Sequence, residues 1–144
     1  MAGRDVLKEL ELELPIAEDM EIRATEAADS LASTVEMSPD KLDEVRMALI
    51  EACINAFEHS HTPDGKVVVT FAVLGDVKPT SLRITVRDHG RGFSPDRVEE
   101  PVLEKKLRDR RKRGWGLMII RGLMDEVDIQ SGGEGTTVVM SKTL

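Results

Sequence analysis

A glutamate and an asparagine stand four residues apart in an otherwise apolar segment. The residues from Met47 to Phe57 read MALIEACINAF, in which Glu51 and Asn55 are the polar side chains. At this spacing the two side chains share one face of a helix. A carboxylate half-enclosed by apolar groups could act as a base, and a carboxamide oxygen could bind a metal ion. The alternative is an exposed helix face without chemical function.

A second acidic side chain ends an alternating segment. The residues from Leu82 to Val86 alternate between apolar and polar, and Asp88 continues this period of two. Its carboxylate is therefore predicted to point toward the apolar face at the strand's end, where it needs a donor such as an adenine amino group. Gly90 and Gly92 follow and permit close backbone approach. An ordinary turn is the alternative for this segment.

Two glycines precede an apolar helix near the C-terminus. Gly114 and Gly116 open a predicted helix that runs to about Met124, and free backbone N–H groups at such a start favour phosphate. Seven of the nine residues from Lys105 to Arg113 are Lys or Arg, which adds cations. The alternatives are that the two glycines only interrupt the secondary structure and that the basic residues form a solvated charged segment. Together the three segments supply a base, a metal-binding amide, an adenine acceptor and a phosphate site.

A layered α/β fold must bring these residues together. The order of predicted elements is a strand, two helices, two strands, an unpatterned loop, a helix and two strands. This order predicts a two-layer α+β sandwich with helices on one face of a largely antiparallel sheet. The unpatterned residues 89–113 are typical of a lid or binding loop. The predicted ranges are 10–15, 18–35, 39–59, 66–74, 82–88, 114–124, 127–129 and 136–140.

Composition narrows the class of protein. The chain has 144 residues, 40% of them apolar, which suits one domain over residues 1–144. A net charge of −7 argues against a dedicated nucleic-acid binder. No apolar run is long enough to span a membrane, and the single Cys53 excludes an intrachain disulfide. We therefore expect a cytoplasmic protein with no direct contact to nucleic acid or membrane.

In order and spacing, the three segments resemble the three boxes of the GHKL ATPase superfamily. In detail they resemble those of the anti-sigma-factor serine kinases. The first box is EACINAFEH from Glu51, the second is DHGRGF from Asp88, and the third is GWGLMIIRGLMDEV from Gly114, followed by GTT from Gly135. The match covers nearly the whole chain. It implies the Bergerat, or histidine-kinase-like, fold with an ATP lid at about residues 93–114.

The resemblance implies a role for each matching residue. Glu51 would be the general base that takes the proton from a partner's serine, and Asn55 would ligate a Mg²⁺ that bridges the ATP phosphates. Asp88 would bind the adenine amino group with Thr136 near it, and Arg113 is the first choice for a lid cation that contacts phosphate. The residues expected around the nucleotide are Asn55, Asp88, Gly90, Gly92, Arg113, Gly114, Gly116, Leu117 and Thr136.

The resemblance also implies a function and partners. The chain would be a homodimeric, ATP-dependent protein-serine kinase and anti-sigma factor that phosphorylates an antagonist protein with a STAS domain. Phosphorylation would release the antagonist through the added charge. One alternative is a nucleotide-gated regulator that binds partners without significant kinase activity, and an antagonist kinase that binds no sigma factor is another. A detached histidine-kinase ATPase domain is disfavoured because no helix with a phosphoacceptor histidine precedes the boxes.

Overall fold

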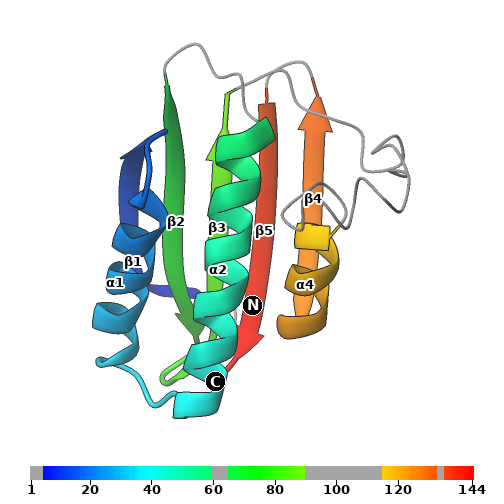
Figure 1. Cartoon of the computed structure of the whole chain (residues 1–144). Coiled ribbons are helices and arrows are strands. Elements are labelled where there is room, and N and C mark those ends of the chain that lie inside the picture. Colours follow the sequence, from blue (N-terminus) through cyan, green and yellow to red (C-terminus); the bar gives the residue numbers. More distant parts are fainter. Residues whose placement is uncertain (1–4, 60–64, 90–114, 133–134) are drawn as a thin grey trace.

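The computed structural model describes residues 5–59, 65–89, 115–132 and 135–144, which fold as a sheet covered by helices (Figure 1). The three helices of these residues lie over the same face of the sheet (Figure 1). The predicted α/β class and the predicted order of elements are therefore confirmed. The elements are β1 (Asp5–Pro15), α1 (Met20–Ala32), α2 (Pro39–His59), β2 (Lys66–Gly75), β3 (Pro79–Asp88), α4 (Trp115–Leu123), β4 (Glu126–Gly132) and β5 (Gly135–Thr143).

The sheet has the strand order β1-β2-β3-β5-β4, and every neighbouring pair is antiparallel. The last strand, β5, thus lies between β3 and β4. Helix α2 runs over the middle of the sheet, with α1 toward β1 and α4 toward β4 (Figure 1). In the described parts of the chain, no helix is long and apolar enough to cross a membrane.

Several predicted boundaries differ from the structure: β3 begins at Pro79 instead of Leu82, β4 ends at Gly132 instead of Ile129, and β5 ends at Thr143 instead of Met140. Strand β1 begins at Asp5 instead of Leu10, because Asp5 and Glu9 still pair with β2 although exposed side chains hide the alternation. Helix α1 covers Met20–Ala32, so the predicted range 18–35 is too long. Its last turn is closed by the hydroxyls of Ser33 and Thr34, which donate to backbone carbonyls three residues earlier.

Helix α2 carries the middle of the core. Its start at Pro39 agrees with the predicted range 39–59, and the Ser38 Oγ before it accepts a hydrogen bond from the Lys41 N–H at 3.2 Å. Its buried face packs against the sheet in one hydrophobic cluster. The α2 members of this cluster are Val45, Ala48, Leu49, Ala52, Cys53 and Ala56, and the sheet contributes Val67, Val69, Phe71, Ile84, Val86, Val138 and Met140 among others.

A buried lysine fixes the end of α4. Lys142 of β5 is 6% exposed, and its Nζ donates to the Leu123 carbonyl at 2.6 Å and lies 3.4 Å from Glu44 Oε1 of α2. Next to it, the Asp125 carboxylate accepts a hydrogen bond from the Thr143 N–H at 2.6 Å. That backbone hydrogen bond is the main reason why the pKa of Asp125 is lowered. These contacts tie the end of α4 to both α2 and β5.

Candidate functional site

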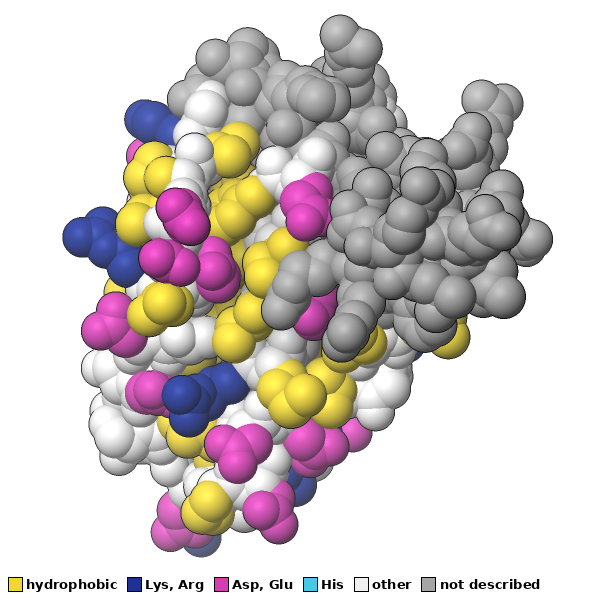
Figure 2. All heavy atoms as spheres, viewed as in Figure 1, with side chains coloured by type: hydrophobic (Ala, Val, Ile, Leu, Met, Phe, Trp, Pro, Cys, Tyr) yellow, Lys and Arg dark blue, Asp and Glu magenta, His cyan; other side chains and the backbone are white. Residues whose placement is uncertain are grey.

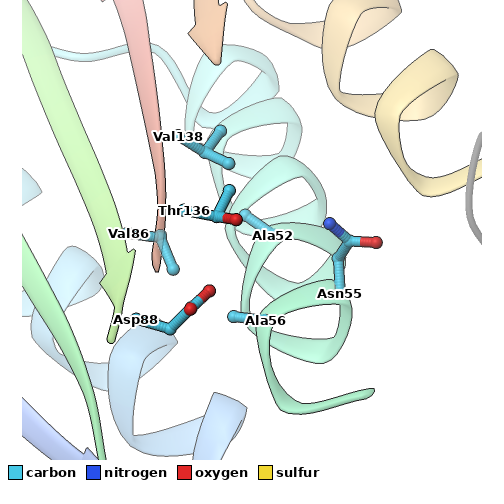
Figure 3. Close-up of a pocket in the computed structure, with 7 residues that line it drawn as sticks. All are labelled: Ala52, Asn55, Ala56, Val86, Asp88, Thr136 and Val138. Carbon is cyan, nitrogen blue, oxygen red and sulfur yellow. The ribbon is translucent and has the colours of Figure 1, made fainter. Parts of the chain in front are cut away.

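A pocket lies where the ends of β3 and β5 approach helix α2 (Figure 3). Its polar lining residues are Asn55 from α2, Asp88 from β3 and Thr136 from β5, and each of them is 5% exposed. The apolar lining is small or β-branched and consists of Ala52, Ala56, Val86 and Val138. Three of the predicted site residues, far apart in the sequence, are thus brought to one pocket.

Asp88 supplies the buried acceptor of this pocket. It is paired in register with Val67 of β2 and continues the inward face of Leu82, Ile84 and Val86, as the period of two predicts. Its carboxylate points toward α2 beside Ala56 (Figure 3). An ionised carboxylate only accepts hydrogen bonds, so this position selects for a ligand group that donates. The amino group of adenine is such a donor.

Thr136 lies beside Asp88 at the start of β5. Its Oγ1 is 2.8 Å from the Ser131 Oγ of β4, so a hydrogen bond between the two hydroxyls fixes its rotamer. The preceding Gly135 has φ 125°, and a Cβ there would overlap the carbonyl oxygen of Asp88. Only glycine fits such a position without strain. Gly135 belongs to the predicted GTT motif, in which no role was predicted for the glycine; in the structure it brings β5 close to the end of β3.

Asn55 marks a second part of the site. Its carboxamide is directed away from Asp88, on the side of α2 that faces α4 (Figure 3). Because Asn55 is buried, the alternative of a fully solvent-exposed helix face is wrong for this residue. Glu51 lies one helical turn earlier and is half-buried. The site therefore has two parts, the Asp88 carboxylate at the end of β3 and the Asn55 carboxamide on the side of α2 that faces α4.

The polar residues of the pocket fit a Mg²⁺ ion that is bound mainly by a nucleotide and by water. In the part of the chain that the structure describes, no group of three or more His, Cys, Asp or Glu side chains could form a metal site. Mg²⁺ in phosphoryl-transfer sites commonly uses few protein oxygens, together with substrate phosphates and water. The Asn55 carboxamide can supply one such oxygen, so the donor set agrees with a nucleotide-bound Mg²⁺ and not with a metal site made of protein side chains alone.

The other predicted site residues do not line this pocket in the described part of the chain. Leu117 of α4 is buried in the hydrophobic core and does not line the pocket. Gly116 lies in the first turn of α4. Four predicted residues and the predicted lid, about residues 93–114, lie outside the described residues; the four are Gly90, Gly92, Arg113 and Gly114.

The small apolar walls of the pocket were not predicted as site residues. Ala52 and Ala56 of α2 belong to the hydrophobic core cluster and also line the pocket. They flank Asn55 on the helix, at positions three before and one after it. Short side chains at these positions leave space between α2 and the sheet. Two alanines beside Asn55 were therefore the sequence feature from which a pocket could have been predicted. Val86 and Val138 face them from the sheet and carried no distinctive signal.

The fold and the buried acceptor pocket define the chain as a nucleotide-binding domain of the histidine-kinase type, and comparisons with known proteins agree. The profile of the histidine kinase-like ATPase domain matches residues 16–142. An anti-sigma F factor from Clostridium acetobutylicum is 30% identical over 135 residues, which are 92% of each chain. The serine-protein kinase RsbW from Bacillus subtilis is 32% identical over 120 residues, covering 79% of this chain and 72% of that protein.

The chain therefore belongs to the histidine kinase-like ATPase family, among the anti-sigma factors and serine-protein kinases of the RsbW type. Membership of this family implies ATP binding.

Solved structures agree in fold. The RsbU and RsbW domains of a Mycobacterium tuberculosis protein align with a TM-score of 0.68 at 21% identity, over 94% of this chain and 32% of that one. The histidine kinase domain of a blue-light-activated kinase from Erythrobacter litoralis aligns with a TM-score of 0.57 at 21% identity, over 100% of this chain and 65% of that one.

Proposed function

We propose that this protein is a protein-serine kinase that transfers the γ-phosphoryl group of ATP to an antagonist protein with a STAS domain, and that it also holds a sigma factor inactive. One observation carries the proposal: Asn55, Asp88 and Thr136 converge, buried, on one pocket, and Glu51 lies on the same helix as Asn55. Relatives of about 30% identity are named anti-sigma F factor and serine-protein kinase. We expect the reaction to take place in the cytoplasm.

In this proposal each residue has one task. The Asp88 carboxylate accepts a hydrogen bond from the adenine amino group, which orients the nucleotide, and the Thr136 hydroxyl lies beside it. The Asn55 oxygen ligates Mg²⁺, which when bound neutralises charge on the phosphates. Positioning of this kind provides most of the catalysis in phosphoryl transfer, because the reaction needs little covalent participation by the protein.

Glu51 acts as the general base. Its carboxylate takes the proton of the partner's serine hydroxyl as the serine oxygen bonds to the γ-phosphorus. The bond from that phosphorus to the bridging oxygen breaks, and ADP leaves. General-base catalysis typically contributes about 10²- to 10⁴-fold in rate. Phosphoserine then adds negative charge to an interface with an acidic protein of net charge −7, which favours release of the antagonist.

The test compares phosphoryl transfer with nucleotide binding in the same variants. Purified STAS-domain proteins from the same genome are incubated with the kinase, Mg²⁺ and ATP labelled in the γ-phosphate. We expect Glu51→Gln to lower serine phosphorylation at least about 100-fold while ADP affinity stays within about threefold. Asn55→Ala should weaken both Mg²⁺-dependent binding and transfer. Asp43→Asn removes an exposed carboxylate from the same helix and is the matched control.

Two outcomes would change the proposal. Transfer that persists in Glu51→Gln would exclude Glu51 as the base. Tight ATP binding without transfer to any antagonist that binds the protein directly would support the other candidate, a nucleotide-gated regulator that exchanges partners without phosphorylating them.

A further inference from the structure

A buried lysine lies on the strand that also carries part of the pocket. The inward-facing residues of β5 alternate along the strand, with Thr136 at one end and Lys142 at the other. Both are buried, at 5% and 6% exposure. A strand rises about 3.3 Å per residue, so the six-residue separation puts Lys142 roughly 20 Å from Thr136. Lys142 therefore lies far from a base in the pocket, and its burial needs another explanation.

The ammonium group of Lys142 joins three elements of the fold. Its Nζ donates to the carbonyl of Leu123, the last residue of α4, at 2.6 Å. It also lies 3.4 Å from the Glu44 Oε1 of α2. A carbonyl at the end of a helix has no partner within the helix, so a cation there supplies a hydrogen bond and complements the helix dipole. A buried charge is costly unless it is paired, and these two contacts offset that cost. Lys142 thus fixes the end of α4 against α2.

The two neighbours of Lys142 on β5 hold the same end of α4. The Asp125 N–H donates to the Ser141 carbonyl at 2.9 Å, and the Asp125 carboxylate accepts from the Thr143 N–H at 2.6 Å. Three consecutive residues of β5 therefore contact the end of α4 and the segment that follows it. Ser141 and Thr143 use backbone groups for these contacts, which almost any residue could provide. The contact of Lys142 depends on its side chain, and it also reaches α2.

Helix periodicity puts Glu44 in line with Glu51 and Asn55. These two residues follow Glu44 by seven and eleven positions, close to two and three turns of 3.6 residues. Both side chains therefore leave α2 within about 20° of the direction of Glu44. Asn55 lies on the side of α2 that faces α4 (Figure 3). Lys142 thus joins α2 and α4 at one level of this shared boundary, and Asn55 lies about 16 Å further along the axis of α2.

The surroundings of the site make the placement of phosphate ligands important. Acidic side chains are scattered over the helix side of the molecule (Figure 2). Such a surface repels phosphates, so binding there depends on closely placed donors and on Mg²⁺. In the proposed site Asn55 supplies an oxygen for Mg²⁺, and the first turn of α4, which contains Gly116, has backbone N–H groups without partners inside the helix. These groups belong to different helices. Their distance consequently depends on how α4 is set against α2.

We propose that Lys142 is a positioning residue for the nucleotide phosphates. By fixing the end of α4 against α2, it sets the distance between the first turn of α4 and the Asn55 oxygen. The base lies against Asp88 and Thr136, in a pocket whose described lining contains no residue of α4. Loss of Lys142 should therefore weaken the binding of the phosphates and spare that of the base. The inference rests on nucleotide binding at the proposed site and does not depend on transfer to a partner protein.

The test compares two ligands on the full chain: ADP with Mg²⁺, measured by titration calorimetry, and adenosine, which lacks the phosphates, measured by NMR titration. We expect Lys142→Met to weaken ADP binding at least about tenfold while adenosine affinity stays within about threefold. Lys142→Arg keeps a donor and a positive charge and should restore most of the ADP affinity. Lys66→Met makes the same change at an exposed lysine of β2, which lies 3.6 Å from Glu13, and is the matched control.

A second variant covers the case in which Lys142→Met does not fold. Glu44→Gln removes the ion pair to α2 and leaves the hydrogen bond to the Leu123 carbonyl in place. The Glu44 side chain is 41% exposed, so the fold should tolerate this change. We expect a loss of ADP affinity of about threefold or more, again without a matching loss for adenosine.

The ratio of the two dissociation constants separates positioning from a loss of stability. Partial unfolding lowers the folded fraction and weakens both ligands by the same factor, so it leaves the ratio unchanged. Circular dichroism confirms that each variant is folded under the conditions of the titrations. If the wild type binds ADP tightly and the ratio is unchanged in Lys142→Met, or in Glu44→Gln where the first variant does not fold, the positioning role is overturned and the proposed site stands. A wild type that binds neither ligand would overturn the site and the inference together.

Discussion

The substitution Asp88→Asn tests how the pocket recognises a base. It preserves the size of the side chain and removes its charge. The native carboxylate can only accept hydrogen bonds, which suits the adenine amino group and opposes the oxygen that guanine carries at the same position. An asparagine can both accept and donate. We therefore expect weaker binding of ADP and a smaller preference for ADP over GDP.

The magnitude follows from the burial of Asp88. At 5% exposure the carboxylate is shielded from solvent, so a hydrogen bond to it has the strength of a buried charged bond, about 1.5–3 kcal/mol. Since about 1.4 kcal/mol corresponds to a factor of ten, ADP affinity should fall roughly 10- to 100-fold. GDP affinity should rise or stay the same. The ratio of the two dissociation constants should consequently fall by a factor of at least about ten.

Titration calorimetry with ADP and with GDP, in the presence of Mg²⁺, measures both constants directly. The control is Asp128→Asn on β4, where the exposed Asp128 Oδ2 accepts a hydrogen bond from Gln130 Nε2 at 3.1 Å. This control should bind both nucleotides as the wild type does. A folded Asp88→Asn variant with an unchanged ADP-to-GDP ratio would refute the role of Asp88 as the adenine acceptor.

Three further predictions concern stability. Gly135→Ala should lower the free energy of unfolding in urea by about 1–3 kcal/mol because its Cβ overlaps Asp88, whereas Gly132→Ala, which has open space, should cost less. Burial raises the pKa of Cys53 to about 12 from 9.0, so at pH 8 its labelling by a thiol reagent should be roughly 1,000-fold slower in the folded protein than in urea, and stability should fall as pH rises above 9. Lys142→Met leaves the Leu123 carbonyl without its donor and should lower the unfolding free energy by about 1–3 kcal/mol, with Lys66→Met as the exposed control.

Local patterns in the sequence were sufficient for most of the fold. The start of α2 was predicted because Ser38 and Pro39 act within one helical turn, and the inward side of Asp88 was predicted because alternation in a strand has a strict period of two. The position of β5 between β3 and β4 was not predicted, since strand order depends on contacts between distant segments. The early start of β1 was missed because exposed side chains on both faces give no alternation.

The candidate site was predictable in its polar residues and less so in its walls. Glu51, Asn55 and Asp88 stood out because polar groups interrupt apolar patterns. Ala52 and Ala56 did not, because a small residue on a buried helix face looks the same whether it packs against the sheet or borders a pocket. The constraint on Gly135 depends on how close its backbone lies to Asp88, a distance that no local pattern encodes.

The register of strand β3 decides which of its side chains reach the pocket. Its even-numbered residues face the helices and end in Asp88, whereas Arg83 and Arg87 point to the other face. A slip of one residue would exchange the two sets, and the buried side chains of the same strand oppose such a slip. Because the sheet separates the two sets, R83E/R87E should leave the ADP-to-GDP ratio as it is, whereas Asp88→Asn should lower it. A folded R83E/R87E variant with a changed ratio would show that the two faces of the sheet are coupled.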